Sequence, residues 1–332
     1  MNSQNQFRSW IAVILILLAS VGVSLASESF VDSVKNDFTV DTHSVLKSKY
    51  QADYSKEGAD TCLDCHDEDS KTPVLDIFKT AHGSQGVSQG PFANNSLQCE
   101  SCHGPAGKHS KKRLRKGEQR EAMIGFVRNE PVPVLEKNEI CLSCHQRNDL
   151  NHWQGSIHQT NDTACSDCHQ IHTQRDPMSE NAAQVQQCGQ CHATQKLAIN
   201  RASTHPLRYG QMGCTDCHNS HDSDGEKLLV AETINETCYQ CHMEKRGPFL
   251  WEHEPVSDNC VNCHLSHGSN QPAMLTQRAP YLCINCHSSE GHVSVNALPS
   301  GQQTALLLGR SCANCHSQVH GSNHPSGRTL QR

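Results

Sequence analysis

Residues Cys260-Val261-Asn262-Cys263-His264-Leu265-Ser266-His267 contain a short pattern that recurs along the whole chain. Their first five positions form a Cys-x-x-Cys-His motif, and ten such motifs use all 20 cysteines. The first cysteines are Cys62, Cys99, Cys141, Cys165, Cys188, Cys214, Cys238, Cys260, Cys283 and Cys312. The second cysteines are Cys65, Cys102, Cys144, Cys168, Cys191, Cys217, Cys241, Cys263, Cys286 and Cys315. The closing histidines are His66, His103, His145, His169, His192, His218, His242, His264, His287 and His316.

The motif is the attachment signature of c-type haem. Two thiols add to the haem vinyl groups as thioethers, and the adjacent imidazole binds the iron. Disulfides do not require a histidine after every second cysteine. Zinc ribbons combine Cys-x-x-Cys pairs into sites with four ligands, and thioredoxin-like pairs need a βαβ context that is missing here. We therefore predict ten covalently bound c-type haems.

The composition agrees with a fold that has little side-chain core. Apolar residues make up 35% of the chain and aromatic residues 5%, against a usual apolar fraction of about 45–50%. Haems would supply the missing interior. We expect a multihaem cytochrome c, an elongated haem stack of mainly short α-helices and irregular loops with little or no β-structure. Each motif is expected to open a short helix, with longer helices over 127–147, 182–201 and 228–243.

The remaining histidines reveal an internal repeat. Ten of the thirteen spare histidines alternate with the motifs, which divides the chain into five tandem dihaem units whose first copy carries an insertion. We predict that these ten are the second axial ligands of the irons. They are His82, His109, His158, His172, His205, His221, His253, His267, His292 and His320.

The spacing of these histidines suggests how they act. A histidine as close to its motif as His172 cannot easily reach the opposite face of the same haem, so we expect it to bind the iron of another haem. His320 is preferred to His324 because the sequence His-Gly-Ser-Asn begins at both His267 and His320. His43 and His152 fall outside the repeat and are interpreted as surface residues.

The N-terminus resembles an export signal. Residues 11–23 are uncharged and mostly apolar, and Ser24-Leu25-Ala26 offers small residues for cleavage. An uncleaved anchor is the alternative, but this run is shorter than the roughly 20 residues that span a bilayer. The predicted organisation is a signal peptide at 1–26, an N-terminal segment at 27–60, and units at 61–137, 138–184, 185–234, 235–279 and 280–332.

Several segments resemble the MtrA/DmsE family of periplasmic decahaem cytochromes over nearly the whole mature chain. They include residues 58–62, 99–105, 244–253 and the ending 310–327. The resemblance implies a periplasmic protein associated with the outer membrane inside a β-barrel porin. It would conduct electrons between a periplasmic or inner-membrane cytochrome donor and an extracellular multihaem cytochrome or reductase, as in metal reduction. The sequence departs most from the family in the basic loop 108–116 (KHSKKRLRK), which is interpreted as a solvated insertion or, less favoured, as a docking patch for an acidic partner.

Two other functions compete with this one. A multihaem reductase needs an open haem, often marked by a motif without its histidine, whereas all ten motifs here end in His. A soluble periplasmic electron shuttle would have the same motifs, so only the family resemblance favours a conduit. The net charge of −6 argues against nucleic-acid binding. The predicted protein is thus an electron carrier and not an enzyme.

Overall fold

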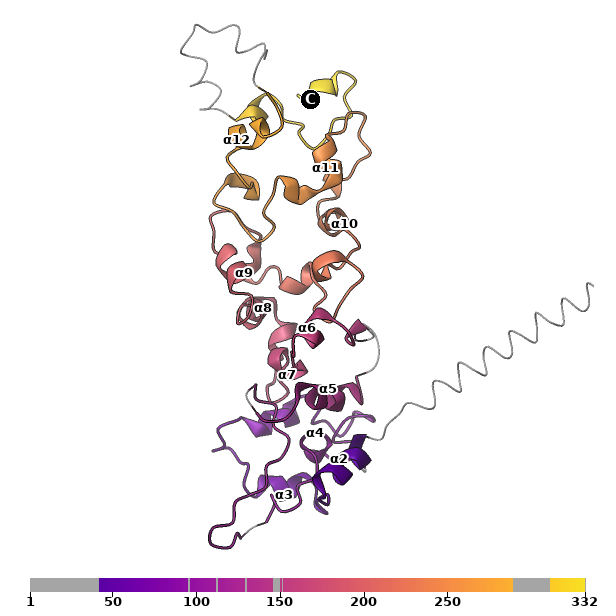
Figure 1. Ribbon diagram of the computed structural model, residues 1–332, viewed down its shortest axis with the longest axis vertical. Coiled ribbons are helices and arrows are strands. Elements are labelled where there is room, and N and C mark those ends of the chain that lie inside the picture. The colour runs from indigo at the N-terminus through magenta and orange to yellow at the C-terminus, as the bar shows by residue number, and fades with distance from the viewer. Residues whose placement is uncertain are drawn as a thin grey trace, which may run out of the picture.

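The computed structural model describes residues 42–94, 96–111, 113–128, 130–145, 150, 152–288 and 311–331. The predicted signal peptide, His292 and the side chain of His43 lie outside this part of the chain. The described segments form a long, narrow molecule in which chain order broadly follows the long axis (Figure 1). Helices α2 and α3 lie near one end, and α11, α12 and the C-terminus lie near the other.

The helices are short. The longest described α-helices, α2 and α5, have nine residues each. The α-helices are α2 (Thr42–Tyr50), α3 (Ala59–Leu63), α4 (Glu100–His103), α5 (Val134–Leu142), α6 (Ile157–Thr160), α7 (Cys165–Cys168), α8 (Asn181–Cys188), α9 (Ala193–Ala198), α10 (Ile234–Tyr239), α11 (Glu254–Asp258) and α12 (Ala279–Ile284). The 3₁₀ helices are η1 (Val74–Lys79), η3 (Pro177–Ser179), η4 (Pro206–Tyr209), η5 (Cys214–Asp216), η6 (Glu226–Leu228), η7 (Met243–Lys245), η8 (Cys260–Asn262), η9 (Pro272–Met274), η10 (Cys312–Asn314) and η11 (Gly327–Thr329).

Extended pairing in the described residues is limited to isolated antiparallel bridges. Two of them connect neighbouring repeats, Ser203 with Ser269 and Trp251 with Ser322. The others join His218 to Leu229 and His264 to Leu275. The expected fold class, an elongated assembly of short helices and loops with little β-structure, is confirmed.

The three longer helices expected from the sequence are wrong in extent. The first is only α5, because Pro131 and Pro133 disfavour helix in the residues before them. The second divides into α8 and α9 at the motif that begins at Cys188. The third is only α10, which the Thr233 hydroxyl caps by accepting a hydrogen bond from the Glu236 backbone N–H at 3.1 Å.

Clusters of buried apolar side chains occur, in the described residues, only in the N-terminal segment and the first two units. Leu46, Ile124 and Ile140 form one cluster. The other joins Ala59 to Ile77 and Phe92, which lie in the insertion of the first unit. Farther along the chain, apolar side chains are often exposed, and Leu197 and Met243 are 73% and 71% accessible. Leu197 follows the motif histidine His192 by five residues, and Met243 follows His242 by one. The apolar surface of a bound haem would therefore cover these exposed side chains.

Candidate haem-binding sites

One helical turn spans every Cys-x-x-Cys-His motif. In all ten motifs the histidine backbone N–H donates to the carbonyl of the first cysteine, at 2.9–3.1 Å. Residues three apart on a helix face the same side, so the turn presents both thiols together. The first motif of a unit ends its helix, as Cys188 ends α8, whereas the second motif begins one, as Cys165 begins α7. The expectation that every motif opens a helix therefore holds only for the second motif of a unit.

The two motifs of each unit meet at their first cysteines. The thiols are hydrogen-bonded in the pairs Cys62–Cys99, Cys141–Cys165, Cys188–Cys214, Cys238–Cys260 and Cys283–Cys312. The hydrogen bond from the partner thiol lowers the pKa of Cys214 and of Cys260 to about 7. No disulfide joins any of the twenty cysteines. The pairing of motifs that defines the repeat is thus a contact in three dimensions.

Buried asparagines connect the paired motifs. Asn138, only 1% exposed, donates to the Thr163 carbonyl at 3.1 Å and accepts from the Cys165 backbone N–H at 2.8 Å. Asn235 likewise accepts from the Cys260 backbone N–H at 2.8 Å. Both asparagines lie three residues before the first cysteine of a unit. The sequence reasoning missed them, although the recurring Asn-Glu-x-Cys pattern was a usable signal.

Nine motif histidines each lie against one spare histidine. The ring centroids are 5.8–6.4 Å apart. A metal bound at about 2 Å by an imidazole on each side would place the centroids at about this separation. The pairs are His66–His109, His145–His82, His103–His172, His192–His158, His169–His221, His242–His205, His218–His267, His287–His253 and His264–His320. The spacing and the donor set both fit a haem iron with two axial histidines.

The pairs connect one unit with the next. The first spare histidine of a unit lies beside the first motif histidine of the following unit, as His158 does beside His192. The second spare histidine lies beside the second motif histidine of the preceding unit, as His221 does beside His169. At the N-terminal end His109 turns back to His66 within its own unit. His316 is the tenth motif histidine, and His292, the predicted ligand left over, lies outside the described residues.

Hydrogen bonds orient the rings. The Nδ1 atoms of His158, His205 and His253 lie 2.8, 3.1 and 2.9 Å from backbone carbonyls, and each carbonyl belongs to the residue before a spare histidine of the next unit. His169 instead meets the Asp176 carboxylate at 2.5 Å. Donation from Nδ1 leaves the Nε2 lone pair free for a metal. None of these acceptors was predicted, because folding brings backbone carbonyls to the rings without a sequence signature.

Strained turns supply three further acceptors. Residues after the second motif adopt left-handed backbone conformations, including Lys227 (φ 54°), Ala273 (φ 53°) and Leu330 (φ 56°). The carbonyl of Lys227 lies 3.0 Å from His218 Nδ1, and that of Ala273 lies 2.8 Å from His264 Nδ1. The Thr329 carbonyl, next to Leu330, lies 2.6 Å from His316 Nδ1. A left-handed non-glycine residue costs about 1–2 kcal/mol, so these turns hold strain beside the ligands.

Burial also favours the form of histidine that binds metal. Desolvation lowers the pKa of His82, His103, His267 and His320 below the ordinary value. A lowered pKa keeps the imidazole neutral, with a lone pair available for coordination.

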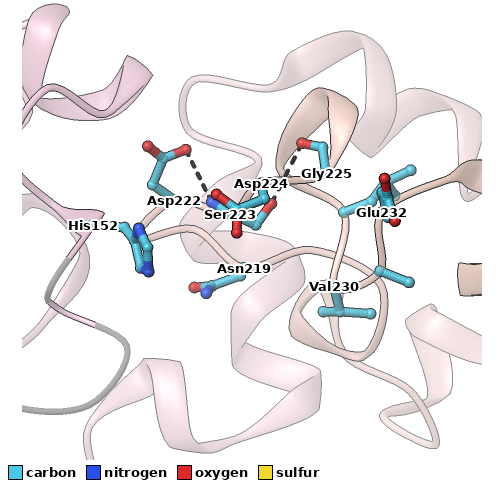
Figure 2. A pocket seen from close by; sticks show the side chains of 10 residues that line it. His152, Asn219, Asp222, Ser223, Asp224, Gly225, Val230 and Glu232 are labelled. Atoms are coloured by element: carbon cyan, nitrogen blue, oxygen red, sulfur yellow. Dashed lines mark hydrogen bonds between the residues drawn. The ribbon is translucent and has the colours of Figure 1, made fainter. Parts of the chain in front are cut away.

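Two of the histidines set aside by the sequence are described, and neither contacts a motif histidine ring in the described residues. His324 Nδ1 accepts hydrogen bonds from Ser326, at 3.2 Å from the backbone N–H and 2.9 Å from the hydroxyl. His152 is exposed and lines a pocket of about 560 Å³ together with Asn219, Asp222 and Glu232 (Figure 2). No cysteine and no paired histidine lines this pocket.

Neither a preformed metal site of clustered side chains nor a membrane-spanning helix occurs in the described residues. They contain no group of three or more His, Cys, Asp or Glu side chains arranged to hold a metal ion. They also contain no helix long and apolar enough to cross a bilayer.

Comparisons with known proteins agree with the motif chemistry. Residues 99–183 match the family described as Cytochrome c-type protein NrfB-like, and residues 205–247 and 253–292 match the Doubled CXXCH motif. Over 288 residues the chain is 44% identical to the multihaem cytochrome MtrA of Shewanella baltica, covering 85% of this chain and 84% of that protein. It is 26% identical over 158 residues to the cytochrome c-type protein NrfB of Haemophilus influenzae, covering 44% of this chain and 70% of that protein. The paired motifs and this similarity show a multihaem electron-transfer cytochrome with ten covalent c-type haems.

Proposed function

The chain belongs to the MtrA family of multihaem cytochromes, and on that premise we propose that it conducts electrons across the outer membrane inside a β-barrel porin. The electrons pass between a periplasmic or inner-membrane cytochrome and an extracellular multihaem cytochrome or reductase. In this proposal the protein is periplasmic, is associated with the outer membrane and serves extracellular respiration such as metal reduction.

The observation that carries the proposal is the series of nine histidine pairs in the described residues of an elongated molecule. It begins with His66 and His109, where His66 follows α3 near one end of the molecule (Figure 1), and continues to His264 and His320, which belongs to the C-terminal unit. Bound c-type haems supply one-electron oxidation and reduction at each of these sites. A narrow molecule with sites from end to end suits transfer over a distance, and an enclosing barrel would separate it from lipid.

In this proposal each iron has the motif histidine and its paired spare histidine as axial ligands, with His292 completing the site of His316. The five dihaem units keep the boundaries 61–137, 138–184, 185–234, 235–279 and 280–332. Two histidine ligands leave no coordination position for a substrate, which favours electron transfer over an active site of the chain's own.

Near-infrared magnetic circular dichroism should therefore report only low-spin haem with two histidine ligands. A sizeable high-spin fraction in the native protein would favour a reductase.

The conduit is tested in liposomes that enclose a reducible dye. With its barrel in the membrane, the cytochrome should pass electrons from an external reductant and bleach the dye. Cytochrome alone and barrel alone are the controls and should leave the dye coloured. If the purified barrel never binds the cytochrome and no electrons cross with both present, the protein is a soluble periplasmic shuttle instead.

A further inference from the structure

Residues 108–121 form a basic loop that also carries one of the paired histidines. The loop contains seven Lys or Arg residues and two Glu residues, a net charge of +5 with histidine neutral. The whole chain has a net charge of −6, so the rest of the chain carries −11. The loop is therefore a local positive region on an acidic protein.

The loop is held in a defined shape. The Arg120 guanidinium donates to the backbone carbonyls of His109 and Lys111, the latter at 2.7 Å. Glu118 accepts from the Arg115 backbone N–H at 3.0 Å and from the Lys111 ammonium at 3.3 Å. Glu121 forms an ion pair with Lys108 at 3.1 Å. Both carboxylates of the loop are thus engaged within it.

The tip of the loop keeps its positive charge. Arg113, Arg115 and Lys116 are exposed, and no described carboxylate forms an ion pair with any of them. Long basic side chains in this situation are solvated and free to meet an acidic surface. Because the loop backbone is tied at its base, such a surface would meet the charges at a fixed place.

The same loop lies on the first haem site. The His109 ring stacks on His66 with centroids 6.3 Å apart and planes 6° apart. His109 Nδ1 donates to the Glu121 carbonyl at 2.7 Å, so the two sides of the loop orient this ring. His66 follows α3, which lies near one end of the molecule (Figure 1). The exposed positive charges therefore belong to the loop that supplies His109 to this terminal site.

We propose that the described residues of this loop, 108–111 and 113–121, form the docking surface for an acidic protein that carries single electrons. Attraction between the loop and the carrier would speed their encounter, while the acidic remainder of the chain would repel the carrier elsewhere. The carrier loses one electron and the haem held by Cys62, Cys65, His66 and His109 gains it. The inference depends on the electron-transfer role of the chain but not on the barrel.

The test uses the full haem-loaded protein in solution, without a barrel, and reduced flavodoxin as the acidic carrier. Stopped-flow mixing gives the bimolecular rate constant for the native protein and for R113E/R115E/K116E. We expect the variant to react at least tenfold more slowly at low ionic strength, and the difference to vanish at high salt. The variant R208E/R278E/R328E makes the same change in net charge at exposed arginines outside the loop. It should lose less than threefold.

Other outcomes would overturn the proposal. Equal rates for the native protein and the loop variant would show that the loop does not guide the carrier. An equal loss in the two triple variants would show that only net charge matters. An equal loss when the reduced protein passes electrons to oxidised basic cytochrome c would show that the loop does not select acidic partners. If the loop binds phosphatidylglycerol vesicles in a charge-dependent manner while flavodoxin rates stay unchanged, the loop is a lipid-binding surface instead.

Trp153 is a buried aromatic residue beside one of the histidine pairs. Its side chain is 5% exposed, and its indole N–H is buried with no acceptor in the part of the chain that the structure describes. A buried donor without a partner is destabilising, so an acceptor is expected at this position. The indole packs edge-on against the His221 ring, with the ring centroids 6.1 Å apart. The His221 ring in turn stacks on that of His169. We infer that Trp153 donates to a propionate of the haem held at this pair, which makes it a positioning residue.

Replacing Trp153 with Phe keeps the ring and removes the donor. One haem potential should fall, because the propionate charge is less well compensated, and the pH range over which that potential varies should move upward. The hydrogen-bond-sensitive indole band in ultraviolet resonance Raman spectra should change when haem is bound. Trp251→Phe is the matched control, since Trp251 already donates to the His324 carbonyl at 3.0 Å. Unchanged potentials and pH dependence in Trp153→Phe would overturn the inference.

Discussion

At the scale of single residues, His320 and His324 differ in their contacts: His320 lies against a motif histidine, whereas the Nδ1 atom of His324 is engaged in hydrogen bonds. His320 lies 6.2 Å from His264, in planes 14° apart. His324 uses the Nδ1 lone pair as an acceptor from Ser326, so in its neutral form the proton is on Nε2 and that nitrogen cannot bind a metal. The two histidines are only four residues apart in the sequence. The sequence alone favoured His320 as the axial ligand, because only His320 is in register with the repeat.

This difference predicts the outcome of two matched substitutions. His320→Met should raise the potential of one haem, because methionine ligation raises haem potentials. His324→Met should leave the redox titration nearly unchanged. Spectroelectrochemical titration of both variants beside the native protein measures the effect. Equal shifts in the two variants, or a shift only in His324→Met, would contradict the assignment.

Asn138 gives a second prediction at this scale. Asn138→Ala leaves the Cys165 N–H and the Thr163 carbonyl without their partner at a buried position. We expect a loss of about 1–3 kcal/mol in the free energy of unfolding. Asn200→Ala is the control, since Asn200 is exposed and bonds only within its own turn, to the Lys196 carbonyl. Denaturant unfolding followed by far-ultraviolet circular dichroism measures both, and similar small losses would show that Asn138 does not connect the two motifs.

At the scale of elements, polar contacts attach α2 to α5. The Tyr50 hydroxyl donates to Glu136 at 2.9 Å, and Lys49 forms an ion pair with the same carboxylate. Burial, followed by this hydrogen bond, raises the pKa of Tyr50 to about 12 from the ordinary 10.0. Between these pH values the folded chain keeps a proton that the unfolded chain loses, so stability falls as pH rises.

The pH dependence is therefore a testable property of this contact. The contribution of Tyr50 should be complete below pH 10 and decline between pH 10 and about 12. Tyr50→Phe should cost about 1–2 kcal/mol at neutral pH and remove this decline. Urea unfolding midpoints from pH 8 upward measure it, with the exposed Tyr281→Phe as the control. A decline of the same size in Tyr50→Phe would assign the effect to other groups.

Local spacing explains which elements the sequence could predict. The turn across each motif follows from residues four apart, so its position was predictable, as were the paired motifs and the short helices. The extent of the helix at α5 was wrong because the prolines before it were not weighed. The partner of His172 could not be derived, because His103 lies in another unit and only the three-dimensional arrangement brings the rings within 6.2 Å.

At the scale of the whole molecule, the histidine pairs make the units interdependent. In each interior unit, one spare histidine pairs with a motif histidine of the preceding unit and the other with one of the following unit. The β-bridges Ser203–Ser269 and Trp251–Ser322 also join neighbouring units. An alternative arrangement would keep both spare histidines within the unit that carries them. Under that alternative His267 would serve a haem of the fourth unit, beside His264, rather than the third-unit haem of His218.

Counting low-spin haems distinguishes the two arrangements. His267→Ala should remove one low-spin haem, since His267 lies 6.1 Å from His218 in planes 13° apart. Adding His218→Ala should remove no further one, because both side chains serve the same iron. Adding His264→Ala instead should remove a second, because that site pairs with His320. Magnetic circular dichroism gives the count whether the affected haem becomes high-spin or fails to attach. The reverse result, with His264 and His267 acting on one haem, would make the units self-contained, and the protein would then be a string of separate dihaem modules rather than one interlocked conductor.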